Sequence, residues 1–228
     1  KGMGSIKISS IQNKIDIEKV LGNLVLKNVG EVLVGKVGGN FSILGAAGTV
    51  HIEKVGGNLV LSDIEAFKGE KIGGNCKAKA VREDFSLEKM GGSFKGQDIS
   101  GELRLGRLGG SFSARGVTLT SDLHAGGDLR VKDFTLAQDH SELKAGGDIH
   151  LEGGKGFDDL KCEMRSGARH SRVKVGEDDL DIRDAHYEYV TGSGGRTLEL
   201  AAGGAIGLSE LSEPEEDLVG DLSDHFEY

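Results

Sequence analysis

Apolar and polar residues alternate in a short unit that recurs along the first two thirds of the chain. Each unit begins with a glycine, which is often doubled, followed by a polar residue. Counted from the second glycine of the pair, or from the single one, apolar residues follow at offsets 2, 4 and 7 and again at 11, 13 and 16. In the 17-residue units the second group comes one position earlier. The second unit shows the pattern with Leu24, Leu26, Val29, Val32, Val34 and Val37.

The spacing of these reference glycines predicts the architecture. They are Gly4, Gly22, Gly39, Gly57, Gly74, Gly92, Gly110, Gly127 and Gly147. Successive ones lie 17 to 20 residues apart, and a near-constant period of this length is typical of a solenoid. The apolar-x-apolar groups have the two-residue period of short strands, which would stack about 4.8 Å apart. We therefore predict an all-β chain whose residues 1–152 form a parallel β-solenoid of about eight coils of 17–18 residues.

The shape of each coil follows from the same offsets. A left-handed hexapeptide solenoid would need an apolar residue at every sixth position, and counting from Leu24 this rule would place Gly30 and Lys36 inside. The rule fails, so a right-handed β-helix or a flattened solenoid is favoured. Glycine at the corners is expected to supply positive φ angles without steric cost.

In the expected core, a small inward residue has a large one nearby, so that the volume of the core stays constant. Among the inward positions of the first six units, the non-apolar exceptions are Gly69 and Gly96, and each lies two residues from a phenylalanine, Phe67 or Phe94. A narrow core of constant volume requires such pairing. Cys76 also falls on an inward position, so we expect it to be a buried free thiol.

Stacking places the residue after each reference glycine in one file along the solenoid axis. These residues are Ser5, Asn23, Asn40, Asn58, Asn75, Ser93, Ser111, Asp128 and Asp148. Asparagine amides at this spacing can hydrogen-bond along the axis, so Asn23, Asn40, Asn58 and Asn75 are predicted to form a structural turn ladder. Asp128 above Asp148 brings two carboxylates together, which leaves a metal cation as a remote alternative.

A second file is basic. It contains Lys19, Lys36, Lys54, Lys71, Lys89, Arg107, His124 and Lys144. Such a column could bind a glycan or another polyanion. The alternative is a self-paired, solvated edge, because Glu18, Glu53, Glu70 and Glu88 lie directly beside the column and could pair with it across coils. No exposed aromatic residues interleave with the cations, as a single-strand binder would require, so no nucleic-acid partner is expected.

Three common catalytic motifs and a phosphate-binding loop are absent from the sequence. It contains no G-x-S-x-G, H-E-x-x-H or C-x-x-C, and the glycine-rich stretch at 153–156 lacks the spacing of a phosphate-binding loop. We therefore expect no enzyme activity and no cofactor. Hydrophobic residues make up 37% of the chain, and no apolar run approaches the roughly 18 residues of a membrane span.

The last third of the chain changes character twice. After Gly147 the period ends while apolar alternation continues, so residues 153–208 are expected to be an irregular β continuation or a cap. Residues 209–228 contain eight acidic residues and no lysine or arginine, against a net charge of −9 for the whole chain. Leu218, Leu222 and Phe226 follow at helical spacing, and with Tyr228 they could dock on a partner. The alternative is a disordered acidic terminus.

The N-terminal coil has six Ile or Val core positions and no evident cap. Exposed strand edges at a solenoid end require a cap or a partner. Either further residues precede this coil, or it stacks on another protein chain or a second copy.

The phrases VGGNLVL, AGGDLRV and AGGDIHL, together with VTGSGGRTLELAAGGAIGLS, carry a family resemblance. The chain resembles bacterial β-strand-repeat proteins that are described as adhesins or as a domain of unknown function. The resemblance covers most of residues 4 to 208. It implies a β-solenoid with a structural or adhesive role at the cell surface or envelope, and it supplies no catalytic residues. The N-terminal stretch KGMGSIKISS contains no signal-peptide hydrophobic region.

Overall fold

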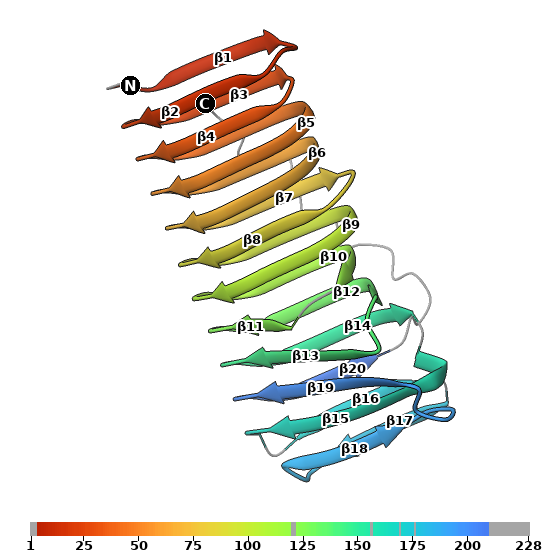
Figure 1. Cartoon of the computed structure of the whole chain (residues 1–228). Helices are drawn as coiled ribbons and strands as arrows, with labels where there is room; N and C mark the ends of the chain where they lie inside the picture. Colours follow the sequence, from red (N-terminus) through yellow and green to blue (C-terminus); the bar gives the residue numbers. More distant parts are fainter. Residues whose placement is uncertain (1–3, 120–121, 156, 169, 176, 210–228) are drawn as a thin grey trace, which may run out of the picture.

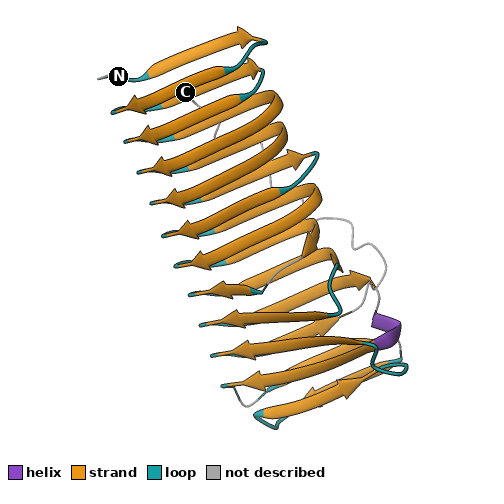
Figure 2. Cartoon of the chain, viewed as in Figure 1, coloured by secondary structure: helices purple, strands orange, loops and turns teal. Residues whose placement is uncertain are grey.

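The chain is an elongated stack of β-coils (Figure 1). The computed structural model describes residues 4–119, 122–155, 157–168, 170–175 and 177–209. Over these ranges the only helix is a single 3₁₀ turn, Phe157–Asp159, among strands and short loops (Figure 2). No helix in the described residues is long and apolar enough to cross a membrane.

Twenty strands make up the part of the stack that the structure describes. They are β1 (Ile6–Ile11), β2 (Ile15–Val20), β3 (Leu24–Val29), β4 (Val32–Val37), β5 (Phe41–Val55), β6 (Leu59–Ile72), β7 (Cys76–Val81), β8 (Phe85–Met90), β9 (Phe94–Leu108), β10 (Phe112–Leu119), β11 (Leu123–Ala125), β12 (Leu129–Leu136), β13 (His140–Ala145), β14 (Ile149–Lys155), β15 (Leu160–Ser166), β16 (Ser171–Val175), β17 (Asp178–Ile182), β18 (His186–Val190), β19 (Arg196–Ala202) and β20 (Ile206–Ser209).

Pairing arranges these strands into two facing sheets. The first sheet runs β1-β3-β5-β6-β7-β9-β10-β12-β14-β20-β16-β17, and the second runs β2-β4-β5-β6-β8-β9-β11-β13-β19-β15-β18. The long strands β5, β6 and β9 bend around a corner and belong to both sheets. All neighbours are parallel except those of β17 and β18. The prediction of a parallel β-solenoid is confirmed.

The inward positions predicted from the offsets form the core. In the second coil Val32 and Val34 are completely buried and Val37 is nearly so, because alternate residues of each strand face the opposite sheet. One hydrophobic cluster extends from Ile15 to Leu208, so regular coils and C-terminal strands share a core.

Small and large core residues compensate as expected. A Cβ atom added to Gly69 would lie 2.7 Å from the ring of Phe67, and one added to Gly96 would lie 2.7 Å from the ring of Phe94. The phenylalanine thus fills the space that the glycine leaves on the same strand. Ring centroids of Phe67 and Phe85 are 4.6 Å apart, which continues the aromatic packing into the next coil.

The doubled glycines correct one expectation. None of the doubled glycines that begin a unit, from Gly38–Gly39 to Gly146–Gly147, adopts a positive φ. They are required by close approach between coils instead, since a Cβ on Gly56 would lie 2.3 Å from the carbonyl oxygen of Gly38, and one on Gly57 would lie 2.4 Å from Oδ1 of Asn40. No side chain fits between backbones that close.

Positive φ angles occur at the opposite corner, at a position that the apolar offsets do not mark. One residue per coil is left-handed there: Ser10, Asn28, Gly45, Asp63, Ala80, Asp98, Gly116, Asp133 and Gly153. Glycine has no steric penalty in this region, and Asn and Asp enter it more readily than most residues. The signal was present in the sequence as a column rich in Gly, Asn and Asp six residues after each reference glycine.

The C-terminal strands are stacked out of sequence order. After β14 the chain passes to β15, which leaves one position open in the second sheet. Strand β19 fills that position, pairing with β13 on one side and β15 on the other, as Figure 1 shows. Strand β20 likewise lies between β14 and β16. We call β19 and β20 the inserted coil.

The end of the stack is closed by antiparallel strands. Strand β17 pairs with β16, and β18 pairs with β15. The loop that leads from this cap back to the inserted coil is held by Asp159, whose Oδ1 accepts hydrogen bonds from the backbone N–H groups of Ser193 (2.8 Å) and Gly195 (3.0 Å). These hydrogen bonds lower the pKa of Asp159, with Gly195 as the largest cause.

Candidate functional site

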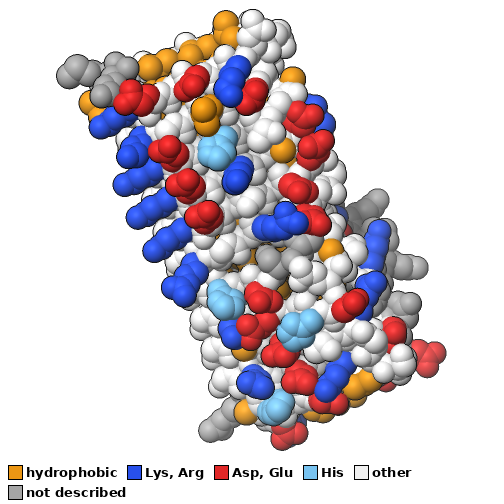
Figure 3. Space-filling model, in the orientation of Figure 1, with side chains coloured by type: hydrophobic (Ala, Val, Ile, Leu, Met, Phe, Trp, Pro, Cys, Tyr) orange, Lys and Arg blue, Asp and Glu red, His pale blue; other side chains and the backbone are white. Residues whose placement is uncertain are grey.

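The basic residues occupy one register column at the corner where the second-sheet strands end. Paired positions join Lys19, Lys36, Lys54, Lys71, Lys89, Arg107, His124 and Lys144 in that order. Neighbouring rungs are therefore about 4.8 Å apart along the axis. A row of Lys and Arg side chains projects along one edge of the molecule (Figure 3).

The column divides into an unpaired part and a paired part. Within the described chain, none of the six cations from Lys19 to Arg107 forms an ion pair with a carboxylate. The last two rungs do: Nζ of Lys144 lies 2.5 Å from Glu142, and Nε2 of His124 lies 3.6 Å from it. The Lys144 ammonium is the main cause of the lowered pKa of Glu142.

An acidic column runs beside the basic one. Glu53, Glu70 and Glu88 stand next to Lys54, Lys71 and Lys89 in the chain, and their strands are in register. Figure 3 shows a red row on the face beside the blue edge. Over the described residues these three carboxylates also lack an ion pair, so the expected Glu–Lys pairing across coils is wrong for them.

Local backbone geometry explains why the two columns do not pair. Ile52 and Val55 are both buried while Glu53 and Lys54 between them are exposed. Two consecutive outward residues occur because the chain turns the corner there, so one side chain leaves the sheet face and the next leaves the edge. Opposite charges thus lie in adjacent files with their side chains directed apart.

The turn ladder is a chain of side-chain-to-backbone hydrogen bonds. The backbone N–H of Asn40 donates to Oδ1 of Asn23 (2.8 Å), that of Asn58 to Oδ1 of Asn40 (2.9 Å), and that of Asn75 to Oδ1 of Asn58 (2.8 Å). The expected amide-to-amide contact is therefore replaced by a contact with the backbone. Each side chain satisfies an N–H that the corner leaves without a strand partner.

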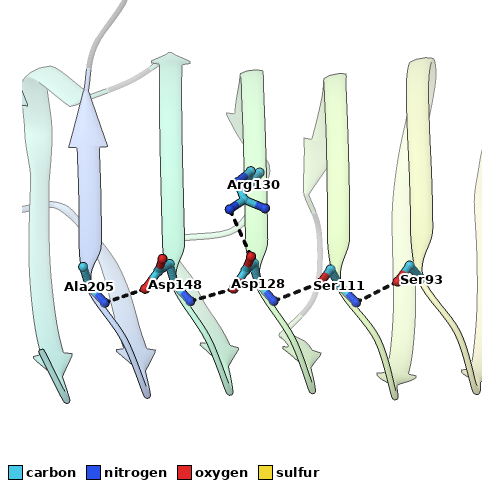
Figure 4. A network of polar contacts seen from close by, with 6 residues as sticks. All are labelled: Ser93, Ser111, Asp128, Arg130, Asp148 and Ala205. Carbon is cyan, nitrogen blue, oxygen red and sulfur yellow. Dashed lines mark hydrogen bonds and ion pairs between the residues drawn. The ribbon is translucent and has the colours of Figure 1, made fainter. Parts of the chain in front are cut away.

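The ladder extends as far as the inserted coil, and along this part residues other than asparagine act as the acceptors (Figure 4). Ser93 and Ser111 use their hydroxyl oxygens, and Asp128 accepts from the N–H of Asp148 at 3.1 Å. Oδ1 of Asp148 then accepts from the N–H of Ala205 at 2.8 Å. A residue 57 positions later in the chain thus occupies the next rung.

The Asp128 and Asp148 carboxylates are occupied by these contacts. Besides the ladder bond, Oδ2 of Asp128 lies 3.0 Å from Nη2 of Arg130. The ladder bond from Asp148 is the largest cause of the lowered pKa of Asp128, and Arg130 contributes. Within the described residues no group of three or more His, Cys, Asp or Glu side chains could hold a metal ion.

Replacing Asn58 tests the acceptor role. Asn58→Ala should lower the free energy of unfolding by about 0.5–1.5 kcal/mol, because it removes the exposed hydrogen bond from the N–H of Asn75. Asn58→Asp keeps an oxygen in place, as Asp128 does naturally, and should cost less. Chemical denaturation of the two variants measures the difference. Equal losses would mean that the side-chain oxygen contributes nothing specific to the ladder.

Two surface depressions contain polar side chains. The one beside the ladder has a volume of about 480 Å³, and its polar lining is Asn58, Asn75, Lys77, Ser93, Lys95, Ser111 and Ser113. It contains no carboxylate or imidazole.

A second depression, in the cap, is lined by His170, Ser171 and Asp181 among others. Ser171 Oγ accepts the N–H of Ile206 at 3.2 Å, while Nδ1 of His170 lies 3.5 Å from Asp181. The hydroxyl thus accepts a hydrogen bond from the inserted coil.

Both cysteines are free and buried. Burial raises the pKa of the Cys162 thiol to about 12 and also raises that of Cys76. A thiolate is the reactive form of cysteine, so these groups serve as small core residues.

The proposed docking residues of the tail, Leu218, Leu222, Phe226 and Tyr228, lie outside the described residues.

Comparisons of the chain with protein-family models, with curated proteins and with solved structures give no match in any of the three. The family resemblance therefore stays an expectation from the sequence.

Proposed function

We propose that the chain is a non-enzymatic, adhesin-like β-solenoid that acts as a rigid scaffold or assembly subunit through protein–protein contacts. The observation that carries this proposal is the arrangement of its polar groups. They are spread in files along the axis at one residue per coil, whereas an active site needs several groups converging on one point.

The continuous core supports a scaffold role. A single apolar cluster runs through the described stack, and each coil adds backbone hydrogen bonds to the next one. Such a stack resists bending because deformation would separate close-packed side chains. A rod of this kind can hold binding partners at fixed distances.

The N-terminal edge offers one contact surface. Among the described residues no strand lies beyond β1 and β2. Ile6, Ile8 and Ile17 are only partly buried there and Ile11 is 41% exposed, although their counterparts in the next coil are fully buried. Apolar side chains beside an unpaired strand edge favour pairing with a further strand, and we propose that a partner can supply it.

The acidic tail is the second proposed contact. Truncation after Ser212 should leave the thermal transition of the solenoid nearly unchanged and remove a partner or shift the assembly state. A truncated protein that assembles as the full chain does would exclude this role.

Solution size and shape test the scaffold proposal. Small-angle scattering and negative-stain microscopy of the full chain should show particles larger than one 24.0 kDa chain, as filaments or closed oligomers. Ile8→Lys with Ile17→Lys should weaken contacts at the N-terminal edge, whereas Ser9→Lys on the outer face should not. A monodisperse single-chain rod at every concentration would contradict the proposal.

The unpaired cations favour a second candidate function, binding of a glycan or other polyanion. Six positive side chains in one file, without carboxylate partners in the described chain, provide the regular charge that a polyanion neutralises. We expect retention on a heparin-like column that is lost by about 0.2 M salt.

Matched variants locate that binding. Lys36→Gln, Lys54→Gln and Lys71→Gln together should abolish retention. The control replaces Lys77, Lys79 and Lys95 by Gln on the outer face of the first sheet, removes the same charge, and should preserve most of it. Absence of retention at low salt excludes polyanion binding.

A further inference from the structure

The adjacent charged columns form a self-complementary strip. The basic file contains Lys54, Lys71 and Lys89, and the acidic file beside it contains Glu53, Glu70 and Glu88 at the same heights. In the described chain none of these six side chains forms an ion pair. Each file therefore places like charges on successive coils, a repulsion that an opposite file from outside would relieve.

The spacing of the charges along the strip favours one kind of binding partner over another. Successive rungs are about 4.8 Å apart because the backbone hydrogen bonds set that distance. A duplex nucleic-acid strand repeats its charge about every 3.4 Å along the axis and would drift out of register within a few rungs. A second copy of this chain has the same repeat, so every rung can meet its counterpart.

We infer that two copies associate side by side through this strip, with their solenoid axes parallel and their coils at equal heights. A twofold axis parallel to the solenoids brings the basic file of one copy opposite the acidic file of the other, so Lys54 faces Glu53 of the second copy and Lys71 faces its Glu70. A twofold axis perpendicular to the solenoids would instead place lysine opposite lysine. The charge pattern thus selects the parallel pair, as an isologous interface.

This inference rests on the proposed assembly function and names one of its contacts. The strip residues are charged and exposed, so the contact is electrostatic and depends strongly on salt. Sedimentation equilibrium of the full chain should show a mass rising toward two chains at about 0.05 M salt and returning to one chain near 0.5 M, where screening shortens the range of the charges to a few ångströms.

Charge reversal provides the decisive experiment. One variant carries Lys54→Glu, Lys71→Glu and Lys89→Glu, and the other carries Glu53→Lys, Glu70→Lys and Glu88→Lys. Each alone should remain a single chain, because both of its files then have the same sign. An equimolar mixture should restore a two-chain species with an association constant at least about ten-fold above either variant alone.

Two controls keep the outcome interpretable. Unchanged thermal transitions would show that both charge-reversed variants fold. If either variant does not fold, a milder variant with glutamine in place of Lys54, Lys71 and Lys89 takes its place. A mixture that stays monomeric while the wild type pairs would overturn the inference. Larger assemblies that persist in both variants would overturn it while leaving the scaffold function intact through other surfaces.

Cross-linking measures the relative orientation of the two copies. In a parallel pair, a Lys19→Cys variant should cross-link to itself through a short bifunctional thiol reagent, and so should an Arg107→Cys variant. Cys76 and Cys162 are buried and should not compete. Cross-links between Lys19→Cys and Arg107→Cys chains in a mixture, in place of the like-to-like products, would show an antiparallel pair and contradict the inference.

Discussion

Ile52→Asp should abolish cooperative folding of the solenoid. Ile52 is 1% exposed and packs between the coils of Val34 and Gly69. A carboxylate there has no partner, and burial of an unpaired charge costs several kcal/mol. The lost packing adds about 2–5 kcal/mol, as for Ile→Ala. Together these losses approach the total stability of an ordinary domain, about 5–15 kcal/mol.

Circular dichroism and thermal denaturation measure this effect against a matched control. His51→Asp introduces the same charge one residue earlier, on the outward side of the strand, and should change the free energy of unfolding by less than about 1 kcal/mol. Ile52→Ala gives a graded variant if the Asp variant is insoluble. Equal and mild effects of Ile52→Asp and His51→Asp would show that the inward register is wrong.

Leu200→Asp should release the inserted coil and, with it, the cap. Leu200 is 1% exposed on β19, between Leu143 of β13 and Met164 of β15. A charge there separates the strand from both neighbours. Strands β15 to β18 reach the rest of the stack through β19 and β20, so they should lose their protection together. The regular coils should survive, because stability in a solenoid is shared mainly between nearest neighbours.

Hydrogen exchange followed by mass spectrometry resolves the two regions. Amides in 160–202 should exchange much faster in Leu200→Asp, while those in 24–108 should keep their protection. Ala201→Asp places the same charge on the adjacent outward position and should have little effect. Loss of protection throughout the chain would mean that the stack folds as one unit and that the inserted coil is needed for all of it.

Sequence periodicity predicted the regular coils well because solenoid contacts are repetitive. Val34 packs against the same offset in the coils above and below, so one rule for the inward positions serves every coil. The file of lysines and the file of ladder residues follow from the same register. Handedness stays a prediction.

Other features depended on distances that a repeat pattern does not contain. The doubled glycines look like turn residues, yet at Gly56 the close carbonyl of Gly38 excludes a side chain. The neighbouring Glu and Lys files look self-neutralising, yet the bend between Ile52 and Val55 directs them apart. Both outcomes depend on the path of the backbone at a corner.

Strand order at the C-terminal end was decided only by the tertiary structure. Residues 153–208 were expected to be an irregular β continuation or a cap, although the phrase that contains Gly203 and Gly204 matches the repeat. A matching phrase fits equally well on any open coil face, because every coil presents the same hydrogen-bonding edge. The sequence by itself therefore determined the regular coils, their register and their inward side chains, but not the inserted coil. Its place between β13–β14 and β15–β16 was determined by long-range packing, since the antiparallel cap closes the end and leaves that position to the last strands of the described chain.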